Sequence, residues 1–207
     1  MKLEQIHFKF PRVRLALFVA ALLFFALACQ HATAAGVGNS PSKVPAISDK
    51  ITLPDVRREF VSPSSRYIFA VSTRDNWKYL RGTGELFSVS GSVRKLLWSR
   101  ELPQQFGPRF VLVSDLGAVV MVDEWINVKT GYAVLIVDRD NRQVAQHGTD
   151  DVQAVLQVPI NQIVQLAKHG WWISAPPILN ASGNVALVKA AGKILAIRLS
   201  DGRLSIS

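Results

Sequence analysis

The sequence contains a single cysteine, Cys29, among 207 residues, so two of its own cysteines cannot form a disulfide. Small extracellular domains often depend on disulfides, and their absence favours a bacterial envelope protein with a self-sufficient core. Histidine is also scarce: beyond residue 34 only His147 and His169 occur, and neither has a second histidine or a cysteine at metal-ligand spacing. The sequence therefore predicts no metal site and no cofactor.

Long runs of one charge are absent too. The chain holds 24 basic and 15 acidic residues, and its first 34 residues take four of the basic and one of the acidic ones, which leaves 20 and 14. This moderate basic excess is scattered through the sequence, a pattern more typical of a solvated surface than of a nucleic-acid patch. We expect no nucleic-acid partner.

The N-terminus has the pattern of an export signal. Four basic residues precede an uninterrupted apolar stretch of 14 residues, Leu15 to Ala28, which is the length of a signal core and short for a membrane span. Ala32-Thr33-Ala34 supplies small residues for cleavage, which predicts a signal peptide over residues 1–34. We expect a helical signal segment and an exported, periplasmic protein.

Two alternatives for this segment stay open. The residues before Cys29 resemble a lipoprotein box, which would make Cys29 a lipidation site, although Ala26 stands where such boxes usually have leucine. The segment could also remain uncleaved as an anchor. In all three cases the membrane is contacted only through the N-terminal segment.

The remainder divides into a linker over residues 35–58 and a β-rich domain over residues 59–207. The linker is rich in glycine, serine and proline, whereas the domain shows short apolar runs separated by turns. Three stretches, beginning at Ser62, Ser114 and Asn180, each place a polar turn before an apolar strand. A hairpin follows each of them, with Gly91, Asn141 and Gly202 at the turns.

This repeat of turn and strand, with Ser62-Pro63-Ser64-Ser65-Arg66-Tyr67 as its first copy, resembles the β-propeller-like repeats of bacterial envelope proteins. The resemblance implies a mostly β domain of three antiparallel hairpin units that present loops to partners. A closed propeller usually has four or more blades. Three units therefore predict an open propeller-like array, a β-sandwich, or a ring completed by another chain.

A helical insertion is predicted over residues 149–170. Thr149 with Asp150 and Asp151 is expected to cap a first helix, and Pro159 to open a second that closes at Gly170. The second helix carries no arginine, so we expect a lid packed on the sheet instead of a DNA-reading motif.

Five tryptophans stand out in a domain of this size. Most are expected to fill the core, and the dipeptide Trp171-Trp172 is expected to send one ring inward and one outward if it is extended. Outward rings could bind a glycan or a partner protein. The predicted binding residues are Arg74, Trp77, Trp125, Trp171 and Trp172.

Catalytic motifs are few. No P-loop, dinucleotide fingerprint or Gly-x-Ser-x-Gly elbow occurs. Asp123 and Glu124 are adjacent at the end of a strand, where neighbouring side chains point to opposite faces. We therefore predict a noncatalytic binding or scaffold protein of the bacterial envelope, with self-association through a sheet edge as a further route. The rival hypothesis is an envelope hydrolase that uses Asp123, Glu124, His147 or His169.

Overall fold

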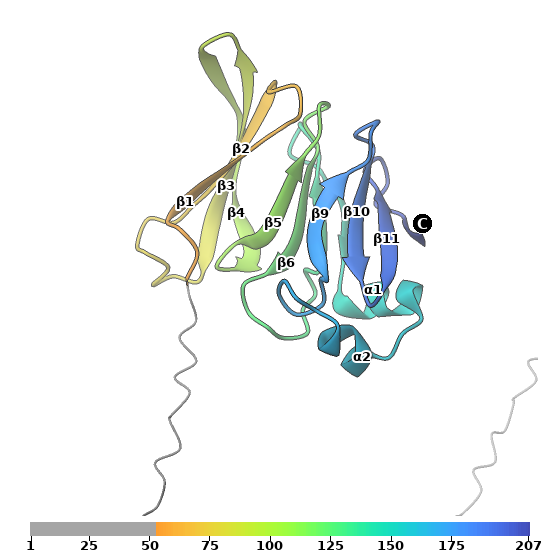
Figure 1. The fold of residues 1–207 in the computed structure, drawn as a ribbon. Helices are drawn as coiled ribbons and strands as arrows, with labels where there is room; N and C mark the ends of the chain where they lie inside the picture. Colours follow the sequence, from red (N-terminus) through yellow and green to blue (C-terminus); the bar gives the residue numbers. More distant parts are fainter. Residues whose placement is uncertain (1–52) are drawn as a thin grey trace, which may run out of the picture. The chain divides into compact units, whose positions relative to one another are not determined.

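The computed structural model describes residues 53–207, and the predicted signal segment and most of the predicted linker lie outside them. The described chain forms three antiparallel sheets of four strands each, and two short helices follow the second sheet in the chain and precede the third (Figure 1). The prediction of a mostly β protein with three antiparallel units and a short helical insertion is therefore confirmed.

Each sheet is a meander in which consecutive strands pair. The first sheet contains β1 (Arg57–Val61), β2 (Tyr67–Ser72), β3 (Arg81–Ser90) and β4 (Val93–Gln105). The second contains β5 (Pro108–Val113), β6 (Val119–Glu124), β7 (Val134–Val137) and β8 (Gln143–His147). The third contains β9 (Ala175–Leu179), β10 (Val185–Ala190), β11 (Lys193–Arg198) and β12 (Leu204–Ile206). Four-stranded meanders of this kind are the units of β-propellers, and here the array is not closed.

The repeated turns occupy the same place in each sheet, between its first and second strands. In each turn the backbone N–H of the first residue donates to a backbone carbonyl four or five residues later. The pairs are Ser62 to Tyr67, Ser114 to Ala118 and Asn180 to Val185, all at 2.9 Å. The hairpin turns also form as predicted, with positive φ at Gly91, Asn141 and Gly202. The predicted units had three strands, and the structure adds a fourth, β1, β5 or β9, before each repeated turn.

The helices are α1 (Thr149–Leu156) and α2 (Ile160–Gln165). Their ends differ from the prediction. Gly148, not Thr149, is the N-cap of α1, and its N–H donates to the Asp151 carboxylate at 2.8 Å. Pro159 precedes α2 as predicted, but α2 ends at Gln165 with Leu166 as its C-cap, well before Gly170.

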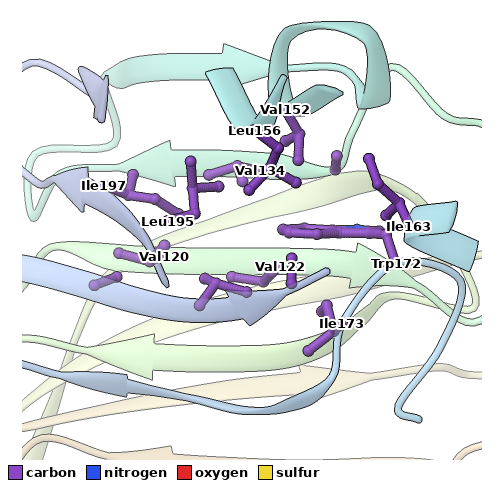
Figure 2. Packing of buried hydrophobic residues seen from close by; sticks show 14 of the residues in the cluster. Val120, Val122, Val134, Val152, Leu156, Ile163, Trp172, Ile173, Leu195 and Ile197 are labelled. Carbon is purple, nitrogen blue, oxygen red and sulfur yellow. The ribbon is translucent and has the colours of Figure 1, made fainter. Parts of the chain in front are cut away.

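The second sheet lies between the other two and is buried on both faces. Every residue of β6 and β7 is buried. One face packs against the first sheet through Phe69, Leu86 and Leu102. The other packs against the third sheet and the helices, where Trp172 lies beside Ile163 of α2 (Figure 2). These two cores fix the loops at the ends of the sheets.

None of the helices in the described part of the chain has both the length and the apolar character needed to cross a membrane.

Candidate functional site

A groove of about 680 Å³ lies between the β2–β3 loop and the β6–β7 loop. Three exposed apolar side chains stand at it: Tyr79 is 58 % exposed, Leu80 43 % and Val128 50 %. The remaining lining is of mixed character and consists of Lys78, Arg81, Pro103, Gln105, Glu124, Ile126, Lys129, Thr130, Gly131 and Tyr132. The groove therefore offers apolar contact with basic groups around it.

Asp75 organises the loop that carries Tyr79. One carboxylate oxygen accepts the Tyr79 N–H at 2.7 Å, and the other accepts the Thr73 hydroxyl at 2.8 Å. These hydrogen bonds lower the pKa of Asp75, and the one from the Thr73 hydroxyl has the largest effect. Trp77 anchors the same loop, since its indole N–H donates to the Pro54 carbonyl at 2.8 Å.

The opposite loop is held by two sets of hydrogen bonds. The Arg109 guanidinium donates to the Trp125 carbonyl and to the Asn127 side chain, each at 3.0 Å. Thr130 exchanges hydrogen bonds with Thr149 at the start of α1. Val128 lies between these two anchors in the chain, so its side chain is presented by a fixed loop.

Glu124 joins the groove to the first sheet. Its side chain is almost fully buried, and its Oε2 accepts the backbone N–H of Gln105 at 2.7 Å. This hydrogen bond uses the carboxylate as a structural acceptor between β6 and β4.

Asp123 takes a different direction from Glu124. Its backbone has a φ of 60°, its side chain is fully buried, and its Oδ2 accepts the Trp171 N–H at 3.3 Å. Arg109 Nε lies 3.6 Å from the same oxygen. Burial nevertheless raises the pKa of Asp123 to about 6. The two adjacent carboxylates thus contact different segments and share no partner among residues 53–207.

Trp125 lies beside two guanidiniums at the end of β6. The Cζ atom of Arg109 is 4.9 Å from the centroid of the Trp125 ring, and the Cζ atom of Arg58 is 5.2 Å from it. The ring N–H donates to the Pro108 carbonyl at 3.3 Å. Burial, helped by repulsion from Arg109, lowers the pKa of Arg58 to about 10. Stacked cations of this kind stabilise the corner where β1, β5 and the β6–β7 loop meet.

The predicted binding residues do not form one surface. Trp77 is 4 % exposed and Trp172 is fully buried, and both pack into the cores, so neither presents an open ring at the surface described here. Trp171 is half-buried, and the Trp171-Trp172 pair lies in a turn, not in the extended conformation for which opposite ring directions were expected. Arg74 is exposed and lines a smaller pocket beside the groove. Trp125 is half-buried under the arginines.

The histidines lie apart from the groove. His147 Nε2 is 2.7 Å from the Gly202 carbonyl, and the His169 ring packs edge-on against Phe110. Within residues 53–207 neither histidine hydrogen-bonds to Asp123 or Glu124, and no group of three histidine, cysteine or acidic side chains is placed to hold a metal ion.

Sequence reasoning missed the side chains that border the groove, Tyr79, Leu80, Val128 and Tyr132. Ile126 and Val128 alternate with polar residues immediately after a strand, which reads as a continuation of that strand. The structure ends the strand at Glu124 and leaves Val128 exposed. An exposed apolar residue within a loop, such as Val128, is the signal that could have identified the groove.

Comparison with known proteins identifies no relative. No protein family model matches the sequence, and no curated protein matches it. Among solved structures, a europium-containing methanol dehydrogenase is similar to 73 % of this chain, with 10 % identity and a TM-score of 0.37. The matched region spans about a quarter of that enzyme, 27 % of its chain.

Proposed function

We propose that this chain is a noncatalytic binding protein of the bacterial envelope that holds a segment of a partner protein in the groove between the β2–β3 and β6–β7 loops. The observation that carries the proposal is the exposure of Tyr79 and Val128 on two separately anchored loops at the same groove. Exposed apolar side chains that gather at one concave site typically mark a binding surface.

The charges around the groove favour an occupant with acidic groups. Arg81 is paired with Glu101 and Lys129 with Asp150, but Lys78 has no ion pair among residues 53–207. Lys78 can therefore pair with a carboxylate of the partner at the rim, where such contacts guide association more than they add affinity.

A protein segment has better support than a glycan. Glycans bind by stacking on open aromatic rings, but Trp77 and Trp172 are buried and two guanidiniums lie over Trp125, which leaves Tyr79 as the well-exposed ring at the groove. The groove offers tyrosine, leucine, valine and isoleucine, which suit the mixed side chains of a peptide.

The rival hydrolase has less support. A hydrolase needs an acid and a base that reach one substrate atom. Glu124 lines the groove but is already bonded to Gln105, while Asp123 is turned toward Trp171. Neither histidine lines the groove.

The proposed location rests on the N-terminal sequence and on the resemblance to envelope repeat proteins. Leu15 to Ala28 has the length of a signal core, and Cys29 follows it directly. Labelling of cells with a fatty-acid analogue is expected to show whether Cys29 is lipidated, and a mature N-terminus at Ala35 would exclude lipidation.

Site-specific photocrosslinking tests the binding proposal. A photoreactive residue is placed at Tyr79 or Val128 of the full chain in intact cells, with Ile206 of β12, which is 44 % exposed, as control. We expect the same protein adduct from both groove positions and none from Ile206. Adducts at all three positions, or at none, would reject the groove as the binding site.

A further inference from the structure

The outer edge of β4 is the longest strand edge in the described part of the chain. β4 has 13 residues, stands at the end of the first sheet and pairs only with β3 there. The other outer strands are much shorter, with five residues in β8 and three in β12. A long unpaired edge presents a row of backbone N–H and C=O groups that a further strand can use.

The hydrogen bonds of β3 show which groups of β4 face outward. The Val89 N–H donates to the Arg66 carbonyl at 2.8 Å, so the backbone of Val89 faces β2. Val89 stands opposite Arg94, whose N–H and C=O therefore point away from β3. Leu96, which stands opposite Phe87, has the same orientation, and the regular alternation ends there because Leu86 pairs with Trp98 and leaves Leu97 as an extra residue.

The side chains along this edge are apolar and basic. Val93 is 66 % exposed, Leu96 48 % and Leu97 38 %, and this end of the hairpin projects beyond the neighbouring sheets (Figure 1). The basic residues are Arg94, Lys95 and Arg100. Arg94 pairs with Glu59, but Lys95 and Arg100 form no ion pair among residues 53–207. The only carboxylate of β4, that of Glu101, is paired with Arg81.

We propose that the β4 edge binds an extended segment of a partner protein, rich in apolar and acidic residues, as a fifth strand of the first sheet. This inference rests on the proposed function and deepens it, because Pro103 and Gln105 of β4 line the groove and the edge leads into it. Backbone hydrogen bonds would supply affinity, and the basic side chains would select an acidic strand.

The same charges oppose self-association through this edge. Two β4 strands side by side would bring Lys95 and Arg100 of each copy near the other's cations, and like charges on paired strands are destabilising. Pro103 lacks a backbone donor and limits pairing to the part of the strand before it.

Two synthetic peptides test the proposal on the full chain in detergent. Each is about ten residues long, and one alternates glutamate with valine while the other alternates lysine with valine. Fluorescence anisotropy is expected to show binding of the glutamate peptide at least about tenfold tighter than that of the lysine peptide. Equal affinities, or no binding, would overturn strand addition.

Two variants locate the binding. Leu96→Pro removes an outward N–H without removing a hydrogen bond to β3. It is expected to weaken binding of the glutamate peptide at least about fivefold. Lys95→Glu keeps the strand intact and is expected to shift the preference toward the lysine peptide. If both variants, folded by circular dichroism, bind as the unmodified chain does, the β4 edge is not the site.

The outcomes separate this inference from the proposed function. Adducts at Tyr79 and Val128 together with no peptide binding would reject strand addition and leave the groove proposal standing. Edge-dependent peptide binding without groove adducts would reject the groove and leave strand addition standing.

Discussion

The carboxylate of Glu124 accepts the backbone N–H of Gln105 at 2.7 Å and so ties β6 of the second sheet to β4 of the first. Replacement by alanine leaves that N–H without its partner in a partly buried place, which is expected to lower the free energy of unfolding by about 1 to 2 kcal/mol. Glu124→Gln keeps an acceptor oxygen and is the matched control. Urea unfolding of both variants measures the difference, and equal losses would show that the hydrogen bond is not what matters.

Asp123 is expected to make stability depend on pH in an unusual direction. Its pKa is about 6 in the folded chain against 3.8 for the ordinary carboxyl, so the folded state keeps a proton that the unfolded state has lost. Stability from this group is full below about pH 4 and falls by about 3 kcal/mol as pH rises to 6 and above.

Asp123→Asn isolates that effect. Asparagine tolerates the positive φ and can still accept the Trp171 N–H, but it does not titrate. The carboxylates of Glu59, Asp115 and Asp201, whose pKa values are lowered, give the opposite trend at low pH and remain in both proteins. The unmodified chain should therefore lose stability relative to Asp123→Asn as the pH rises from 4 to 6. A flat difference would contradict the raised pKa.

Gly170 sits where a side chain cannot. Its φ is 85°, and an added Cβ would overlap Asp123 Oδ2 and come within 2.6 Å of Arg109 Nε. Gly170→Ala is expected to destabilise by about 2 kcal/mol or more through strain and this overlap. Gly183→Ala has a similar φ of 68° with nothing within 4 Å, so it should cost only the backbone strain of about 1 kcal/mol. Thermal unfolding of both variants compares them.

The adjacent tryptophans are expected to differ sharply. Trp172 is fully buried in the core between the second sheet, the third sheet and the helices, so Trp172→Ala should cost about 3 to 5 kcal/mol. Trp171 is half-buried, and Trp171→Ala should cost clearly less. Denaturant unfolding of the two variants tests this, and similar losses would contradict the placement of their rings.

Much of the fold could be predicted because it depends on local signals. Gly91, Asn141 and Gly202 favour positive φ, and the turns at Ser62, Ser114 and Asn180 precede clear apolar strands. The first strands of the three sheets, β1, β5 and β9, were missed, and for β1 and β9 the signals are weak. β1 begins with two arginines and a glutamate, and β9 contains two prolines, so neither shows the usual alternation.

The site could be predicted much less well. Tyr79 and Val128 line one groove only because the first two sheets stack, and no sequence period encodes that packing. Tryptophans appeared the better binding candidates, yet Trp77 and Trp172 are the large side chains that fill the cores. Burial is a property of the assembled sheets, so residue type alone could not separate core rings from surface rings.

The most direct test of the central claim is the affinity of the groove for its captured segment. A peptide with the crosslinked sequence is titrated into the full chain, into the double variant Tyr79→Ser, Val128→Ser, and into the control Ile206→Ser. The account predicts at least about tenfold weaker binding for the double variant and unchanged binding for the control. Equal dissociation constants for all three proteins would contradict it.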